Sequence, residues 1–213
     1  MCIYTVFALC ALGGYLLGSI PFGLVLTRLA GYGDIRKIGS GNIGATNVLR
    51  TGNKWLALLT VLLDAFKAGI AAYIATRVVF VKDYYLFDFI TTTNIIGGLI
   101  AGSFGVIGHM FPVWLKFKGG KGVSSAFGLL LMTNWQIALI ALGVWLFMAF
   151  TFRYSSLSAL TAAASIPFVS FFMLSPVNTI FYSAIVILVI AKHHANIVRL
   201  IKGQESKISF KKK

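Results

Sequence analysis

The chain has 213 residues, of which 58% are hydrophobic and only 11% are charged. A soluble domain carries about 25% charged residues, so water is excluded as the main solvent. The net charge is +14, from 19 basic and five acidic residues. In a soluble protein this balance would suggest nucleic acid, but the preference of basic residues for the cytoplasmic side of a membrane explains it better. We therefore expect an integral membrane protein and no nucleic acid partner.

Four stretches lack Asp, Glu, Lys and Arg, and each is long enough to cross a bilayer, which takes about 20 helical residues. They are residues 1–27, 89–115, 123–152 and 154–191. As straight helices the last two would be about 45 and 57 Å long, against a hydrocarbon core of about 30 Å. The last stretch must therefore turn, and the sequence LSPVN at 174–178 is the expected turn.

In chain order, we expect helices joined by polar loops. The expected elements are a helix at 3–27, a loop at 28–54, helices at 55–80 and about 91–112, either one or two helices in 123–152, and a pair in 154–191. Length favours two helices in 123–152, separated at 133–136. Charge agrees, because a single helix would send Arg153 and the basic C-terminal tail to the outer face.

The expected fold class is an all-α integral membrane protein of about seven transmembrane helices, with the N-terminus outside and the C-terminus in the cytoplasm. In this topology 16 basic residues lie inside, and only Arg77 and Lys82 face outside. The fourth helix, 123–132, is too short for a straight full span. The chain is expected to be a single membrane domain, 1–213, with inner loops at 28–54 and 114–122 and a cytoplasmic tail at 192–213.

The first inner loop contains GDIRKIGSGNIGATN at 33–47 and continues to Arg50. Glycines let backbone amides point together at an anion, and arginine can hold a phosphate through two parallel hydrogen bonds. The polar residues that can add hydrogen bonds are Ser40, Asn42, Thr46 and Asn47. A flexible basic loop resting on anionic lipid is the alternative. Lipid attraction needs only Lys and Arg, so the small polar residues favour a phosphate site.

The second inner loop reads KFKGGKGVSS at 116–125, immediately before an expected helix. Free amides and the helix dipole favour anions at a helix N-terminus, so this loop also suits phosphate or carboxylate. A positive-inside anchor would explain the lysines but not Gly119, Gly120 and Gly122. The GxxxxGK[ST] pattern of a nucleotide loop fails because Gly122 follows Lys121, so ATP is not implied.

A third polar patch, HHANIVRLIKGQE at 193–205, follows the last expected helix. A lone histidine at a membrane boundary is more often an interfacial residue than a catalyst. Two adjacent histidines, with Asn196 and Arg199 nearby and two phosphate-like loops on the same side of the membrane, favour a functional role. The chain has three histidines and few carboxylates, so we expect no metal site and no cofactor.

Asp64 and Lys67 lie three residues apart in the second expected helix, which puts them on one helix face. Charges inside a membrane are costly and usually functional. These two lie only two to three turns beyond Trp55, and we interpret them as a structural pair rather than a catalytic one.

Five segments together carry a resemblance to a known family. They are GSIPFG at 18–23, DIRKIGSGNIGATNVLR at 34–50, LDAFK at 63–67, GHMFPVWLKFKGGKGV at 108–123 and HHANIVRLIKGQE at 193–205. In this order, and over nearly the whole chain, they resemble the bacterial membrane glycerol-3-phosphate acyltransferases that use acyl phosphate, the PlsY family. His193 matches the motif histidine, whereas His194 departs from the arginine that the family commonly has there.

The resemblance implies transfer of a fatty acyl group from acyl phosphate to the 1-hydroxyl of glycerol 3-phosphate, giving lysophosphatidic acid and phosphate in the first acylation of phospholipid synthesis. The implied partners are acyl phosphate, glycerol 3-phosphate and membrane lipid. The implied location is the bacterial inner membrane, with the active site toward the cytoplasm. The donor is already activated, so the protein must position the substrates, neutralise phosphate charge, stabilise the oxyanion and remove one proton.

The resemblance also assigns roles to residues. Ser40 and Arg50 are expected to contact phosphate or the oxyanion, and Lys121 to bind phosphate with the glycine amides. His193 and Asn196 are expected to serve the acceptor, and the base is either His193 or a phosphate oxygen of a substrate. The expected catalytic residues are thus Ser40, Lys121, His193 and Asn196. The expected substrate-binding residues are Arg50, Asn42, Thr46, Asn47, Gly119, Gly120, Gly122, Ser124 and Glu205.

Two other functional classes also fit a basic, glycine-rich membrane protein. An anion transporter would usually place its polar groups near the bilayer midplane and often shows internal repeats. Here the polar motifs lie at one interface and no repeat is visible. A lipid-binding scaffold would show no turnover.

Overall fold

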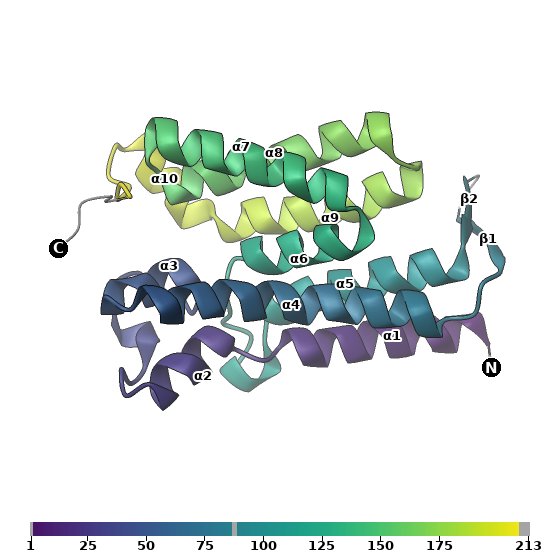
Figure 1. Ribbon diagram of the computed structural model, residues 1–213, viewed down its shortest axis with the longest axis horizontal. Helices are drawn as coiled ribbons and strands as arrows, with labels where there is room; N and C mark the ends of the chain where they lie inside the picture. Colours follow the sequence, from purple (N-terminus) through teal and green to yellow (C-terminus); the bar gives the residue numbers. More distant parts are fainter. Residues whose placement is uncertain (1, 87–88, 209–213) are drawn as a thin grey trace. The chain divides into compact units, whose positions relative to one another are not determined.

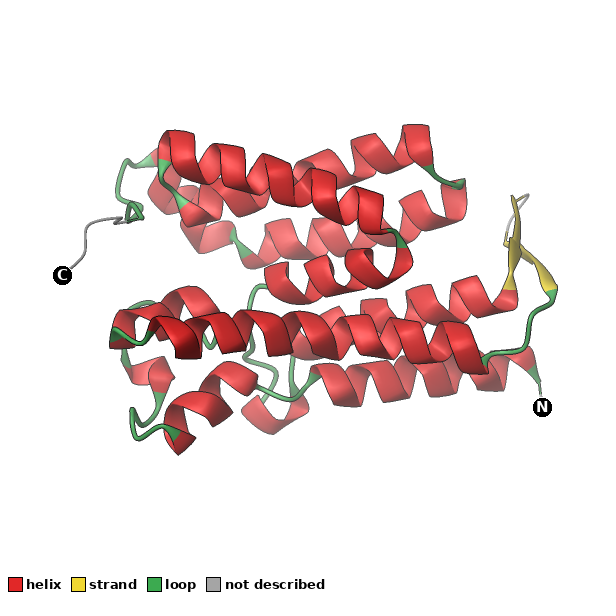
Figure 2. Ribbon diagram, viewed as in Figure 1, coloured by secondary structure: helices red, strands yellow, loops and turns green. Residues whose placement is uncertain are grey.

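The computed structural model describes residues 2–86 and 89–208, so residues 209–213 of the expected tail lie outside the described residues. The chain is predominantly helical (Figure 2). It divides into two compact units, Met1–Asn134 and Trp135–Lys213, and each unit is described by itself. The expectation of a single membrane domain stays a prediction.

The first unit is built on five helices. They are α1 (Ile3–Gly18), α2 (Phe22–Leu29), α4 (Lys54–Val78), α5 (Thr93–Met110) and α6 (Val123–Thr133). Helix α5 packs against α1 and α4, and α4 also packs against α6 (Figure 1). Small residues make these contacts close, because a Cβ added at Gly18 would overlap the backbone of Gly105, and one at Gly128 would overlap the backbone of Ala65.

The first expected helix, 3–27, is broken in the structure. Helix α1 ends at Gly18 and α2 begins at Phe22, with Pro21 at its N-cap. Proline has no backbone N–H and disfavours helical geometry in the residue before it, so Ile20 and Pro21 interrupt the run of helical hydrogen bonds.

Short elements join the helices of the first unit. They are the 3-10 helices η1 (Ile35–Lys37), η2 (Leu49–Thr51) and η3 (Val113–Leu115), the short helix α3 (Ala45–Val48), and the strands β1 (Asp83–Leu86) and β2 (Phe89–Thr92). The strands pair antiparallel, with Asp83 opposite Thr92. This hairpin departs from the all-α expectation, and the third helix begins at Thr93 rather than at about 91. The aromatic and β-branched residues of the two strands suit extended backbone.

The second unit contains α7 (Trp135–Phe152), α8 (Ser155–Met173), α9 (Pro176–Lys192) and α10 (His194–Ile201). The expected separation within 123–152 is confirmed, because α6 ends at Thr133 and α7 begins at Trp135. The expected turn at 174–178 is confirmed as well. Ser175 caps α9, and Pro176 takes the first position of that helix, where its missing N–H is not needed.

By length and composition, five helical segments of the described chain can cross a membrane: 3–29, 54–78, 93–115, 135–152 and 155–173. Helices α9 and α10 make a sixth if they form one span with a bend of 59°. Helix α6, with 11 residues, is shorter than a bilayer requires. The count of seven and the orientation of the termini therefore stay predictions.

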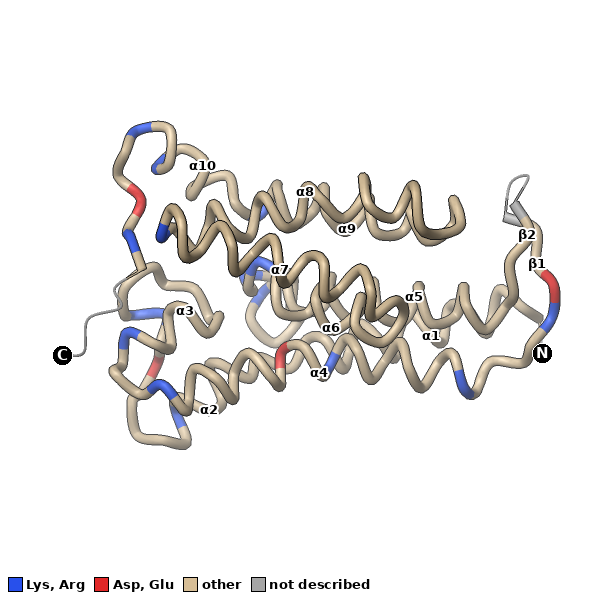
Figure 3. The backbone as a smooth tube through the Cα atoms, turned by 45° about the horizontal axis from the view of Figure 1, so that its top comes forward, with Lys and Arg blue, Asp and Glu red and all other residues tan. Residues whose placement is uncertain are grey.

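In the first unit the basic residues are unevenly distributed along the long axis. Lys and Arg gather near α2 and α3, and fewer lie near the β-hairpin at the other end (Figure 3). This one-sided distribution is the pattern that the positive-inside rule associates with a cytoplasmic face.

Candidate functional site

The first loop, residues 30–53, packs on a small apolar core and is stabilised by Asp34. Its core residues are Leu24, Ile35, Ile43, Val48 and Ala57. Asp34 accepts a hydrogen bond from the backbone N–H of Arg36 and forms ion pairs with the Arg36 and Arg28 guanidinium groups, at 2.5 and 3.3 Å. The hydrogen bonds from the Arg36 side chain hold the pKa of the Asp34 carboxyl well below its usual range.

Asn47 organises the candidate phosphate segment from within. Its side-chain Nδ2 donates to the carbonyls of Ile35, Ile38 and Asn42 at 2.8 to 3.0 Å. Its Oδ1 accepts from the backbone N–H of Ser40 at 3.1 Å. Because the side chain is buried and these bonds use its hydrogen-bonding capacity, the structure places Asn47 as the scaffold of the loop.

Ser40 and Arg50, ten residues apart in sequence, lie close together. A Cβ added at Gly39 would overlap the Arg50 guanidinium, so that group lies against the backbone next to Ser40. Gly39 has a φ of +56°, a conformation that favours glycine. Both side chains are exposed. Within the described residues Arg50 has no carboxylate partner, whereas Arg28 and Arg36 share Asp34.

The remaining candidates of the first loop differ in their surroundings. Asn42 is half-buried, and its Oδ1 accepts from the backbone N–H of Gly44 at 3.2 Å, which fixes the turn before α3. Thr46 is exposed on α3. Of the two side chains, that of Thr46 is the more accessible to a ligand.

The second loop, residues 116–122, is closed by backbone contacts with the end of α5. The amide of Gly119 donates to the carbonyl of Met110 and the amide of Gly120 to that of His109, at 3.2 and 3.0 Å. Cβ atoms at Gly119, Gly120 or Gly122 would overlap Pro112, the His109 ring or Met110, respectively. The glycines thus permit close packing, and direct anion binding by the amides of Gly119 and Gly120 stays a prediction.

Helix α6 begins directly after this loop. Gly122, with a φ of +83°, is its N-cap, and Ser124 lies half-buried in the first turn. As at any helix start, the amides of this turn have no intrahelical acceptor. Lys121 is half-buried beside them. The geometry offers an anion a cation together with the positive end of a helix dipole.

The polar patch of the second unit centres on Glu205. Its carboxylate accepts hydrogen bonds from Ser156, Asn196 and Arg199, each at 2.6 Å. Burial alone would raise the pKa of Glu205, but these donors outweigh it and hold the pKa below its usual value. Glu205 therefore fixes the orientation of the buried Asn196 amide.

His193 lies at the junction of α9 and α10 and is 2% exposed. Its Nδ1 lies 2.7 Å from the carbonyl oxygen of Val189. Since a carbonyl can only accept, Nδ1 donates this bond, which fixes the orientation of the ring. The neighbouring His194 is exposed.

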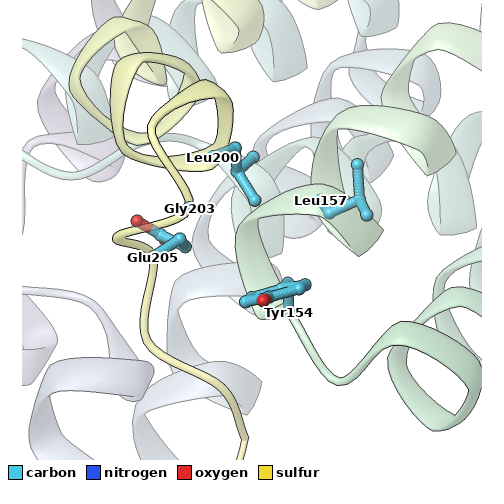
Figure 4. Close-up of a pocket in the computed structure, with 5 residues that line it drawn as sticks. All are labelled: Tyr154, Leu157, Leu200, Gly203 and Glu205. Atoms are coloured by element: carbon cyan, nitrogen blue, oxygen red, sulfur yellow. The ribbon is translucent and has the colours of Figure 1, made fainter.

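A cavity of about 260 Å³ in the second unit is lined by Tyr154, Leu157, Leu200, Gly203 and Glu205 (Figure 4). It is slightly smaller than typical small-molecule sites, which span about 300 to 1,000 Å³. Its lining is mostly apolar, and Glu205 contributes a carboxylate that is already engaged by three donors.

Two features of the first unit bear on the sequence interpretation. Asp64 and Lys67 form the expected pair, with Oδ1 and Nζ 2.9 Å apart. His109 lies beside them, its Nδ1 3.4 Å from the same Asp64 oxygen. Sequence reasoning gave His109 no role, because 45 residues separate it from Asp64. Its only sequence signal was its place in the segment GHMFPVWLKFKGGKGV.

Comparisons with known proteins agree with the motifs. The family model described as glycerol-3-phosphate acyltransferase matches residues 8–203. A glycerol-3-phosphate acyltransferase of Rhodospirillum rubrum is 50% identical over 212 residues, covering 98% of this chain and 94% of the relative. One of Mesorhizobium japonicum is 54% identical over 198 residues, covering 93% and 94%.

Solved structures of PlsY (YgiH), an integral membrane glycerol 3-phosphate acyltransferase, are also similar. The glycerol 3-phosphate form has a TM-score of 0.84 and 37% identity, covering 95% of this chain and 96% of that chain. The lysophosphatidic acid form has a TM-score of 0.82 and 36% identity, covering 95% of each. These likenesses confirm the expected class of a helical integral membrane protein. The chain belongs to the glycerol-3-phosphate acyltransferase family, in its PlsY branch.

Proposed function

We propose that this protein transfers a fatty acyl group from acyl phosphate to the 1-hydroxyl of glycerol 3-phosphate, forming lysophosphatidic acid and phosphate. The observation that carries the proposal is the arrangement of Ser40 and Arg50 over the Asn47 scaffold, in a chain 37% identical to a protein solved with glycerol 3-phosphate. An exposed guanidinium beside a hydroxyl suits a phosphate, which arginine can bind through two parallel hydrogen bonds.

The chemistry requires little covalent participation by the protein. The acceptor oxygen attacks the acyl carbonyl carbon, the bond from that carbon to the phosphate oxygen breaks, and phosphate leaves with the electron pair. The hydroxyl proton passes to a base. Both substrates carry a phosphate, and the first unit has two basic, glycine-containing loops. Positioning and charge stabilisation are the main contributions that such a reaction needs from an enzyme.

Three candidate residues of the first unit supply the charge stabilisation. Ser40 and Arg50 contact a phosphate or the oxyanion, and Lys121 at the start of α6 neutralises a second phosphate. The remaining candidates of these loops, which bind or shape the site, are Asn42, Thr46, Asn47, Gly119, Gly120, Gly122 and Ser124.

In this proposal His193 and Asn196 serve the acceptor, glycerol 3-phosphate. The bond from Nδ1 to the Val189 carbonyl fixes the His193 ring, and His193 either positions the acceptor hydroxyl or serves as its general base. The Asn196 amide, oriented by Glu205, binds the glycerol moiety. Glu205, also expected to bind substrate, orients Asn196 through the hydrogen bond that it accepts from that amide.

The identity of the acyl donor is tested by comparing turnover with three candidate donors. Purified protein in detergent is given glycerol 3-phosphate with palmitoyl phosphate, palmitoyl-CoA or palmitoyl acyl carrier protein, and lysophosphatidic acid is followed. Turnover should be fastest with palmitoyl phosphate and should be unchanged by a chelator. Faster turnover with either thioester would show that acyl phosphate is not the preferred donor.

The site faces the cytoplasm of a bacterial inner membrane in this proposal, and the chain crosses the membrane seven times. The charge distribution of 16 basic residues inside and two outside supports it. Single cysteines replacing Lys37, Lys118 or Lys207 should be shielded from an impermeant thiol reagent in intact cells, and one replacing Lys82 should react. Labelling at position 207 from outside would contradict the seven-helix count.

A further inference from the structure

Three ionisable residues form a buried charge cluster in the first unit, which we define as Asp64 and Lys67 of α4 and His109 of α5. Oδ1 of Asp64 lies 2.9 Å from Nζ of Lys67 and 3.4 Å from Nδ1 of His109. Each of the three residues is at most 4% exposed. The cluster therefore lies inside the helix packing.

Lys67 connects the cluster to the first loop. Its Nζ donates to the carbonyl of Ile20 at 2.8 Å, in the break between α1 and α2. Helix α2 starts two residues later and lies directly against the first loop, since a Cβ at Gly23 would overlap the carbonyl of Ile43. Displacing Lys67 would therefore move the helix on which the Ser40 segment rests.

His109 connects the cluster to the second loop. Its ring lies so close to Gly120 that no side chain fits there, and its carbonyl accepts from the Gly120 amide. At the far end of the loop, the buried Ser125 hydroxyl donates to the backbone carbonyl of Asp64 at 2.7 Å. The Lys121 segment is thus tied at both ends to the backbone of His109 and Asp64, and the His109 ring packs against Gly120.

A structural role alone does not explain why these residues are ionisable. Buried ion pairs are often replaced by apolar residues of similar volume without loss of stability. Ionisable groups inside a membrane are correspondingly rare and are mostly retained for function. Directional hydrogen bonds, unlike apolar contacts, fix the orientation of the backbone segments that they join.

We propose that Asp64, Lys67 and His109 are positioning residues that hold the two phosphate loops in register for acyl transfer. This inference rests on the proposed function. The cluster contacts neither substrate and acts through α2 on the Ser40 segment and through Gly120 on the Lys121 segment. Its loss is expected to lower kcat about 10²-fold, the effect of misplacing catalytic groups by about 1 Å.

The test uses two variants that avoid leaving a buried charge alone. His109→Phe keeps a flat ring beside Gly120 and breaks the contact with Asp64. The double variant Asp64→Asn with Lys67→Met removes both charges together. Ser103→Ala, which removes a buried hydroxyl on the same helix α5, is the matched control and should retain wild-type turnover. The thermal midpoint in detergent and kcat with palmitoyl phosphate and glycerol 3-phosphate are measured for each protein.

Coupling to the loop separates positioning from stability. Lys121→Ala should cost a smaller factor in kcat in the His109→Phe background than in the wild type, because the loop is already displaced. The positioning role would be overturned if the factors lost in kcat by Lys121→Ala and His109→Phe simply multiplied in the combined variant. It would also be overturned if both cluster variants kept wild-type kcat, or if both failed to fold. If the wild-type protein formed no lysophosphatidic acid, the proposed function would fail as well, and the parallel wild-type assay identifies that case.

Discussion

The candidate phosphate loops of the first unit and the polar patch of the second unit differ in which charged groups are paired. In the first unit Asp34 occupies Arg28 and Arg36, and Arg50 remains exposed without a carboxylate among the described residues. In the second unit Glu205 is the centre, and Ser156, Asn196 and Arg199 all donate to it. Excess cations suit phosphate, whereas an engaged carboxylate holds the hydroxyl, amide and guanidinium groups that donate to it in place. The excess of cations in the first unit supports the proposal that its loops bind phosphate.

The largest effect is expected at His193, if it is the base. His193→Gln keeps a hydrogen-bonding side chain but cannot take up the proton, and general base catalysis is worth about 10² to 10⁴ in rate. Turnover should fall by that factor, and the low-pH limb of the pH-rate profile should disappear. His194→Gln, a change in the exposed neighbour, is the matched control and should be nearly silent.

Substantial activity of His193→Gln with the low-pH limb retained would remove histidine as the base. A phosphate oxygen of the substrate would then take the proton. In that case His193 would only bind or orient the acceptor.

The next largest effects are expected at Ser40 and Lys121 of the first unit. Ser40→Ala and Lys121→Ala should each lower kcat by about 10² to 10³, the usual loss for one preorganised donor to developing charge. Lys118→Ala, in the same loop as Lys121 and exposed, serves as the control and should change kcat little. Equal small effects at all three positions would indicate general surface electrostatics in place of a site.

A smaller effect on kcat, accompanied by lost stability, is expected at the scaffold of the first loop. Asn47→Ala leaves carbonyls of the loop without their donor, which costs about 1 to 3 kcal/mol per buried group. Asn53→Ala removes the N-cap of α4, where Oδ1 accepts from the Leu56 amide at 3.0 Å, and should cost about 1 kcal/mol. The free energy of unfolding and kcat are measured for both variants. Only Asn47→Ala should lower kcat, and equal kcat values would contradict its role as the site scaffold.

The smallest effect is expected from adding one methyl group to a glycine. Gly120→Ala would push into the His109 ring and should destabilise the protein by about 1 to 3 kcal/mol. At Gly44 the nearest atom to an added Cβ is Oδ1 of Asn42 at 3.7 Å, so Gly44→Ala should be tolerated. Thermal midpoints in detergent check both. Equal midpoints would mean that the second loop does not depend on close packing.

The sequence predicted the elements that depend on local spacing. The turn before Pro176 and the separation between α6 and α7 follow from the length of uncharged runs and from turn residues. The break at Pro21 was missed because the surrounding run is apolar and long enough to read as one helix. The hairpin of β1 and β2 was not predicted, because the expected helices at 55–80 and 91–112 leave residues 81–90 as a connection with no assigned element.

For the candidate site, the motifs predict which residues take part, and this stays a prediction. They do not predict how those residues are arranged. Asn47 was expected to bind substrate, and its buried bonds to the loop carbonyls could not be inferred from spacing. His109 was overlooked because its partner lies on another helix. Such contacts are set by packing between helices, which a single sequence does not reveal.

The central claim is that both substrates react here in a single transfer. Purified protein with palmitoyl phosphate and glycerol 3-phosphate, followed simultaneously for phosphate and lysophosphatidic acid, tests it most directly. One phosphate should appear for each lysophosphatidic acid, and neither should form without glycerol 3-phosphate. Phosphate release at the same rate without the acceptor, or no lysophosphatidic acid in its presence, would contradict the account.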